Sequence, residues 1–293
     1  MMSRNSPDKR LSVAKTYKLY IGGKFSRTES GRTFEARSPS GDLLANLCQA
    51  SRKDLREAVV VARKAFPGWA KRSGYNRGQI LYRIAEMMEG RIDQLANEIS
   101  SQGVPPKKAL KEVETSIERF VYYAGWADKY VQIHSSVNPV STAHLNFSVP
   151  EPMGIVGIIP PNEPSLLGLA TLLAPALAGG NVAISLVSET RPLAPATFAE
   201  SLHSSDVPAG VVNILTGFRK ELLSDFSTHM DVNAILAADL SPKERKLTEE
   251  NSALNLKRVI HLPPKAISAT DNPGISPILS LQETKTTWHP IGT

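Results

Sequence analysis

The sequence predicts an α/β protein built around a Rossmann-like parallel sheet with helices on both faces. From residue 153 onwards, short apolar segments alternate with helical ones, and this alternation is typical of a parallel sheet. The expected strands are residues 154–159, 181–187, 210–217, 232–238 and 256–262. The first four of these segments carry no charged residue, as is typical of strands buried on both faces. The expected helices between them are residues 165–177, 192–204, 221–228 and 241–251.

The composition excludes several other classes of protein. The 293 residues are 41% hydrophobic and 21% charged, which is ordinary for a globular protein. No run of 18 or more apolar residues occurs, so we expect no transmembrane helix and no membrane partner. The net charge is +6, but no basic face is interleaved with aromatic residues, so we expect no nucleic-acid partner. Residues 1–16 are predicted to form a flexible basic tail without the apolar core of a signal peptide, and a cytoplasmic location is expected.

Residues 17–130 are predicted to hold two strand pairs followed by helices. Residues 17–25 read as a hairpin around Gly22 and Gly23, and residues 34–50 as two strands around a Ser-Pro-Ser-Gly turn. The chain's only cysteine, Cys48, lies in the second of these strands, where packing is its expected role; a lone cysteine also excludes an internal disulfide. Three amphipathic helices are expected next, at residues 54–69 with Ser51 as cap, 77–98 and 107–130.

The two ends of the Rossmann-like core (residues 153–262) differ from it in pattern. Residues 131–152 alternate apolar and polar side chains with a break at Asn138-Pro139, which predicts a long hairpin. Residues 263–282 contain several prolines and no clear period, so we expect a connector. Residues 283–293 alternate again and predict a final strand, which should pair with a distant segment of this chain or of a neighbour.

Several short motifs occur in the same order as these elements. They read YIGGKF (20–25), SPSG (38–41), EPMGIV (151–156), APALAGGN (174–181) and PAGVVN (208–213). In this order and spacing the chain resembles the aldehyde dehydrogenase superfamily over about residues 17–262. The resemblance implies a cofactor-type domain in two parts, residues 17–130 and 153–262.

The resemblance also gives a meaning to the ends of the chain. In this family, a hairpin and the last strand form an oligomerisation arm, and residues 131–152 and 283–290 look like those two parts. The segment that should hold the catalytic domain is missing, and residues 263–282 stand in its place. The chain most resembles the C-terminal, non-catalytic domain of the two-domain aldehyde dehydrogenases of family sixteen, which ends in a similar Thr-Lys…Trp…Pro strand. Such a chain is expected to form a homo-oligomer, in the first place a dimer, or a hetero-oligomer with a full-length aldehyde dehydrogenase.

The catalytic groups of the family are degraded here. Its reaction needs a cysteine thiolate as nucleophile, and no cysteine follows Cys48. The position of the general-base Glu aligns with Leu262, and the neighbouring His261 is more simply a structural or exposed histidine than a substitute base. In the turn at residues 160–164, Asn162 aligns with the oxyanion-stabilising Asn and is a vestigial catalytic residue, although an Asn between prolines is also an ordinary turn residue.

The cofactor residues are retained only in part. The resemblance points to Ile159, Pro160 and Glu189 as vestigial cofactor-binding residues, whereas the ribose-binding Lys aligns with Leu186. The turn that should approach the pyrophosphate, residues 237–241, has no glycine and contains Asp239, whose charge would repel a phosphate. We therefore expect no cofactor, with NAD or NADP as the alternative. The remaining histidines lack ligand spacing, so no metal site is expected.

Three functions follow, in order of preference. The first is an aldehyde dehydrogenase-like pseudoenzyme that acts as an assembly, scaffold or accessory subunit. The second is a nucleotide-binding or sensing module of the NAD type, which would need measurable nucleotide affinity. The third is an NAD(P)-dependent aldehyde oxidoreductase completed by a partner subunit, which would need aldehyde-dependent NADH formation.

Overall fold

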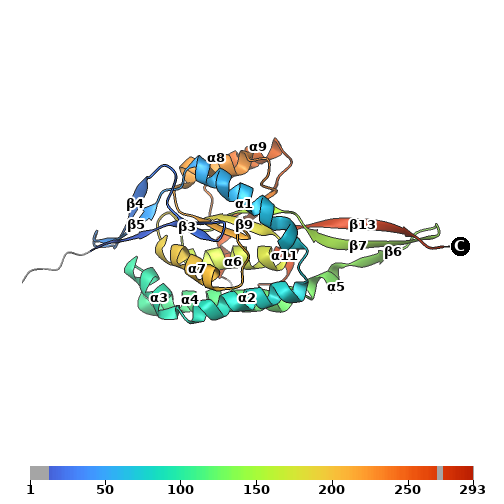
Figure 1. Cartoon of the computed structure of the whole chain (residues 1–293), viewed down its shortest axis with the longest axis horizontal. Helices are drawn as coiled ribbons and strands as arrows, with labels where there is room; N and C mark the ends of the chain where they lie inside the picture. Colours follow the sequence, from blue (N-terminus) through green and yellow to red (C-terminus); the bar gives the residue numbers. More distant parts are fainter. Residues whose placement is uncertain (1–12, 269–272, 293) are drawn as a thin grey trace, which may run out of the picture.

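The central sheet follows the predicted alternation of strands and helices. The computed structural model describes residues 13–268 and 273–292 (Figure 1). Its parallel strands are β8 (Ile155–Ile159), β9 (Val182–Leu186), β10 (Val212–Leu215), β11 (Ala234–Ala238) and β12 (Arg258–Leu262). Their order across the sheet is β12-β11-β8-β9-β10, and the hairpin β2 (Leu19–Ile21) and β3 (Lys24–Ser26) continues it antiparallel to β10. The predicted parallel sheet is therefore confirmed, with a two-stranded antiparallel extension.

Helices cover both faces of this sheet, as predicted (Figure 1). On one face lie α1 (Arg52–Ala70) and α8 (Arg219–Thr228), with α9 (Pro242–Ala253) beside α8. On the other face lie α6 (Ser165–Ala178) and α7 (Leu193–Ser204). A further layer covers α6 and consists of α2 (Gly74–Glu89), α3 (Ile92–Ser101) and α4 (Pro106–Trp126). Because α6 is sandwiched between two layers, all of its residues are buried, which explains its nearly uncharged sequence.

Two predicted boundaries are wrong, and the connector holds helices that its sequence pattern does not show. The single helix expected at residues 77–98 is two helices, because α2 ends at Gly90, a poor helix former, and α3 starts after Arg91. The helix expected to reach residue 130 ends at Trp126, and a short helix, α5 (Tyr130–His134), replaces the first residues of the predicted hairpin. The connector holds two short helices, α10 (Pro264–Ser268) and α11 (Ser276–Leu279), and in α11 a proline occupies the first turn, where its missing N–H costs nothing.

The N-terminal segment also departs from the prediction. Strand β1 (Lys15–Tyr17) begins two residues inside the expected tail, because it pairs in parallel with β5 (Leu43–Cys48). On its other side β5 pairs with β4 (Thr33–Arg37), which confirms the strand pair predicted there. Residues 1–12, the rest of the predicted tail, lie outside the described residues. Cys48 is buried in β5, as expected.

A three-stranded arm projects from the sheet (Figure 1). It consists of β6 (Ser136–Asn138), β7 (His144–Pro152) and β13 (Gln282–Pro290), in the order β13-β7-β6. The last strand pairs antiparallel with the whole of β7, from Gln282 opposite Pro152 to Pro290 opposite His144. The predicted terminal strand thus pairs with the predicted hairpin within the same chain.

The connector packs against the core rather than crossing solvent. Its apolar side chains Ile267, Ile278 and Leu281 are buried in the main hydrophobic cluster, and α10 and α11 contact α6. The connector therefore covers part of helix α6. None of the helices in the described ranges is long and apolar enough to cross a membrane.

Lys257, at the start of β12, gives a testable pH dependence. Its side chain is buried and donates to the carbonyl oxygens of His229 and Val232, 2.8 and 2.5 Å away. Burial lowers the pKa of Lys257 from 10.5 to about 8. Between those values the unfolded chain binds more protons than the folded one, so stability rises with pH across this window and is lost as pH falls through 8.

We expect the free energy of unfolding of the wild type, measured relative to Lys257→Met, to rise by at most about 3 kcal/mol between pH 8 and pH 10.5. Urea unfolding of both proteins at matched pH values measures this difference. A difference that stays flat across the window would contradict the lowered pKa of Lys257.

Candidate functional site

The strand order places a candidate site at one edge of the central sheet. From β8 the chain proceeds through β9 and β10 in one direction, and then through β11 and β12 in the other. Such a reversal opens a crevice beyond the carboxyl ends of the strands, where ligands of open α/β sheets bind. The segments that border it are residues 160–164 after β8, 187–189 after β9, 216–219 after β10 and 239–241 after β11.

Asn162 joins two of these segments. Its Oδ1 accepts hydrogen bonds from the Ser188 hydroxyl at 3.2 Å and from the Glu189 N–H at 3.1 Å. Its backbone oxygen accepts a second bond from Ser188, at 3.1 Å. These contacts fix the turn after β8 to the end of β9.

Glu189 is also engaged within the chain. Its Oε2 accepts the backbone N–H of Arg219, the first residue of α8, at 3.0 Å. Helix α8 has no side-chain cap from its own N-cap residue, Phe218. A carboxylate at a helix N-terminus interacts favourably with the exposed N–H groups and the helix dipole. Glu189 therefore caps α8 from the end of β9.

The side chain of Arg219 lies at the reversal of strand order, between β8 and β11. Its Nη2 donates to the carbonyl oxygen of Pro160 at 2.6 Å, and its Nη1 donates to that of Asp239 at 3.0 Å. The residue is only 5% exposed. Ile159, the last residue of β8, is fully buried.

Sequence reasoning missed Arg219. The only available signal was its position, because it directly follows a turn at the carboxyl end of a predicted strand. The carbonyl groups that it binds come from other strand ends and leave no trace in the sequence.

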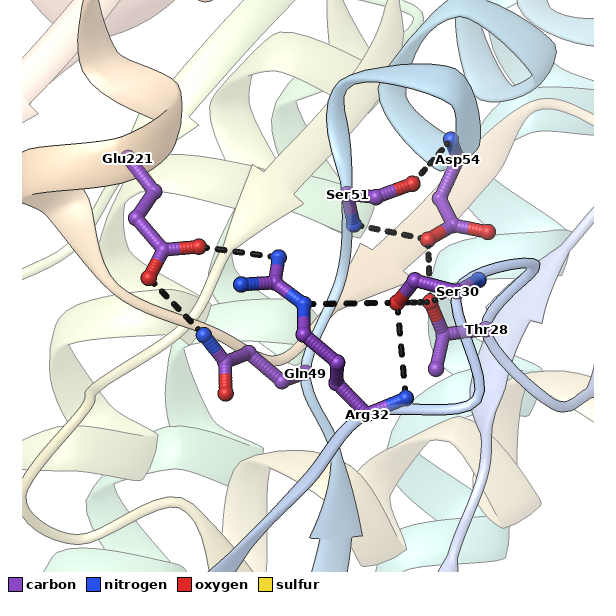
Figure 2. A network of polar contacts seen from close by, with 7 residues as sticks. All are labelled: Thr28, Ser30, Arg32, Gln49, Ser51, Asp54 and Glu221. Carbon is purple, nitrogen blue, oxygen red and sulfur yellow. Dashed lines mark hydrogen bonds and ion pairs between the residues drawn. The ribbon is translucent and has the colours of Figure 1, made fainter.

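A polar network holds the start of α8 in place (Figure 2). Glu221, in the first turn, accepts hydrogen bonds from Arg32 at 3.0 Å and from Gln49 at 2.8 Å. Beside it, Ser51 and Asp54 form a capping box at the start of α1. The loop before β4 is tied to the same box, since the Thr28 hydroxyl donates to Asp54 at 2.6 Å (Figure 2). The first turn of α8, and with it Arg219, is therefore fixed from two sides.

The N-terminus of α9 is also capped by its own side chains. Ser241 is its N-cap, and Glu244 returns to accept the Ser241 N–H at 2.8 Å and the Ser241 hydroxyl at 2.7 Å. Just before it, Asp239 has a backbone φ of 57°, a left-handed conformation that favours glycine. The carbonyl that Asp239 presents in this conformation is the one that Arg219 binds.

His261 and Leu262 lie at a separate place along the edge. They line a cavity of about 490 Å³ together with Asp239 and Arg245. The Nε2 of His261 is 3.2 Å from a carboxylate oxygen of Glu249, and burial lowers the pKa of His261 below its ordinary 6.5. Asn162 does not line this cavity, so the structure does not bring Asn162 together with His261 and Leu262. Among the residues that the structure describes, no group of three or more His, Cys, Asp or Glu side chains could hold a metal ion.

Comparison with known sequences agrees with this architecture. The model of the family described as "Aldehyde dehydrogenase family" matches residues 25–261. The chain is 34% identical over 248 residues to the mitochondrial benzaldehyde dehydrogenase of Antirrhinum majus, covering 83% of this chain and 46% of that protein. It is 33% identical over 258 residues to the cytosolic 10-formyltetrahydrofolate dehydrogenase of Xenopus tropicalis, covering 85% of this chain and 28% of that protein.

Solved structures give the same result. An NAD⁺ complex of the aldehyde dehydrogenase from Bacillus cereus superimposes with a TM-score of 0.80 at 30% identity. The superposition covers 85% of this chain and 51% of that one. The chain thus spans about half the length, or less, of the relatives that it matches. Because the family match extends over most of the sequence and the fold agrees with it, the chain belongs to the aldehyde dehydrogenase family.

Proposed function

We propose that this chain is a non-catalytic member of the family that acts as an assembly or accessory subunit, and that its arm is the assembly surface. The observation that carries the proposal is the two-faced character of the arm. Its three-stranded sheet stands away from the core (Figure 1), and in β6 and the first part of β7 the apolar side chains lie on one face and the polar ones on the other.

The polar face carries a ladder of hydrogen bonds across all three strands. The Nδ2 of Asn138 donates to Asn146 Oδ1 at 2.6 Å and to the Ser148 hydroxyl at 2.9 Å. Ser148 in turn lies 2.8 Å from the hydroxyl of Thr286. This face satisfies its own polar groups and fixes the register of the three strands.

The opposite face is apolar on β6 and β7, whereas β13 contributes Lys285, Thr287 and His289 to it. Leu145, Phe147 and Val149 alternate with the polar residues of β7 and so share this face, and Val137 of β6 lies opposite Phe147. Val137 is 73% exposed and Leu145 is 42% exposed. A sheet normally packs such a face against another layer, and exposed apolar patches mark interaction sites. The outer edge of β13 is also unpaired within the described part of the chain, so it could accept a further strand.

The state of the catalytic groups supports the non-catalytic half of the proposal. Cys48, the only thiol in the chain, is buried in a strand of the small N-terminal sheet. Leu262 stands where the resemblance places the general base. Neither position offers a nucleophile or a base at the crevice.

The partner in this proposal is another chain with the same kind of arm. A second copy fits first, because two identical apolar faces related by a twofold axis bury each other. A full-length aldehyde dehydrogenase is the other partner that the family resemblance implies, and the same face would serve it.

The test is a pair of variants on opposite faces of the arm. Val137→Asp combined with Phe147→Asp places two charges on the apolar face, and Thr284→Asp places one on the polar face. We expect the double variant to weaken association about 100-fold or more, because each buried charge costs more than about 1.4 kcal/mol. Thr284→Asp should retain the mass of the wild-type oligomer.

Native mass spectrometry and sedimentation of the wild type and both variants measure this. Circular dichroism checks that the core of the double variant still folds. The proposal fails if the double variant keeps the wild-type mass. It also fails if the wild type is a monomer that binds no full-length family member, or if the purified chain forms NADH from an aldehyde.

A further inference from the structure

We infer that Arg219 fills the crevice of this chain from within and excludes a dinucleotide from it. The inference does not depend on the arm. It concerns the place where the strand order reverses, at which an open α/β sheet would bind its ligand.

The contacts of Arg219 join the ends of four strands. Its side chain binds the carbonyl oxygens of Pro160, after β8, and Asp239, after β11. Its backbone N–H binds Glu189, after β9, and Arg219 itself follows β10. The guanidinium therefore bridges the two strands that flank the crevice, in the position that a ligand would need to enter.

The alternative role for a guanidinium at this place is to bind a phosphate group. Burial argues against it, because Arg219 is 5% exposed and two of its N–H groups point at protein carbonyls rather than outward. An approaching phosphate would have to break both of these hydrogen bonds and move the side chain. The contacts of Glu221 hold the first turn of α8, from which Arg219 projects, in place (Figure 2).

The neighbouring groups do not fit a dinucleotide either. The carboxylate of Glu189, which the resemblance assigns to the ribose, is held by the N-terminus of α8. The N-terminus of α9, where a phosphate would bind, is closed by the capping box of Ser241 and Glu244. Leu186 replaces the Lys expected beside the ribose. The groups that could hold the ligand are thus engaged by the chain itself, and Arg219 is the one whose bulk blocks entry.

The experiment measures NAD⁺ binding to the full chain by calorimetry and by the shift in melting temperature. We expect no measurable binding to the wild type at 5 mM NAD⁺. Arg219→Ala should bind NAD⁺ with a dissociation constant at least about tenfold lower than the weakest binding that the experiment can detect for the wild type. Its melting temperature should rise by about 3 °C at 5 mM NAD⁺. Arg219→Gln, which keeps part of the side chain, serves if the alanine variant does not fold.

Two control variants separate this inference from simpler explanations. Arg77 is matched in burial, at 6% exposed, and its guanidinium also bridges two carbonyl oxygens, those of Arg72 and Ala178, away from the crevice. Arg77→Ala should destabilise the fold without creating NAD⁺ binding. Glu244→Ala removes a negative charge from the crevice and should also create none.

Three results would overturn the inference. Binding to the wild type that is lost in Arg219→Ala would make Arg219 a phosphate receptor. Binding gained equally by Arg77→Ala or Glu244→Ala would show that loosening or charge, rather than Arg219, controls access. Absence of binding in a folded Arg219→Ala and Arg219→Gln would show that Arg219 is not what excludes the dinucleotide.

Discussion

Asn181→Ala is expected to lower the free energy of unfolding by about 3 kcal/mol, since it leaves the buried N–H of Gly154 without a partner and leaves the Leu281 carbonyl with the Gln282 amide as its only side-chain donor in the described structure. Asn181 is fully buried at the start of β9. Its Oδ1 accepts the N–H of Gly154 at 3.0 Å, and its Nδ2 donates to the carbonyl oxygen of Leu281, also at 3.0 Å. One amide thus ties the entry of β8 to the end of the connector, where β13 begins.

Urea unfolding followed by circular dichroism measures this loss. Asn251→Ala is the matched control, because the Asn251 amide donates to Ser227 at 3.0 Å from a partly exposed position on α9. We expect the control to cost less than about 1 kcal/mol. An equal and small loss in both variants would show that the Asn181 contacts do not hold the connector to the core.

The central sheet was predictable from the sequence because burial there is nearly complete. Strands β8 (Ile155–Ile159) and β11 (Ala234–Ala238) are buried along their whole length, so their sequences are continuously apolar and the predicted segments contain them. The arm was predictable for a different reason, since the alternation along β7 places apolar side chains on one side of the strand and polar ones on the other. Where the chain is only partly covered, as at Gly90 and in the connector, local turn and helix preferences decide the boundaries, and the periodicity does not show them.

The candidate site was less predictable. The family resemblance singled out Asn162 and Glu189 after the first two strands of the core, and the structure brings these two residues together through the Glu189 N–H. What each side chain binds depends on carbonyl and N–H groups contributed by other strands. For this reason the bridging role of Arg219 could be found only in the structure.

Glu112→Ala is expected to lower the free energy of unfolding by about 3 kcal/mol, since it removes the cap of the most buried helix. Helix α6 begins after Pro164, which has no side chain able to cap it. Glu112 of α4 supplies the missing acceptor, and its Oε1 accepts the N–H groups of Leu166 and Leu167 at 2.8 and 3.4 Å. Both hydrogen bonds are buried, so the alanine variant leaves the two N–H groups without their side-chain acceptor. Chemical unfolding at pH 7 measures the loss.

The variant Glu112→Gln distinguishes the effect of the hydrogen-bond acceptor on stability from the effect of the negative charge. A glutamine keeps a side-chain oxygen at the same position, so the cost of this variant should stay below about 1 kcal/mol. Burial raises the pKa of Glu112 above its ordinary 4.5, so the folded chain binds more protons than the unfolded one just above that pH. The contribution of this raised pKa to the free energy of unfolding is fully present below pH 4.5 and is lost as pH rises through the folded-state pKa of Glu112.

The glutamine variant should therefore gain stability relative to the wild type as pH rises from 4.5 to 7. If glutamine were as damaging as alanine at pH 7, the negative charge rather than the oxygen would be the stabilising feature. That result would contradict the raised pKa of Glu112. The expected result makes the start of α6, like the starts of α8 and α9, a helix end that the chain caps with its own carboxylate. Three helix N-termini that face the carboxyl edge of a Rossmann-like sheet, each already satisfied, leave few free N–H groups for an anionic ligand.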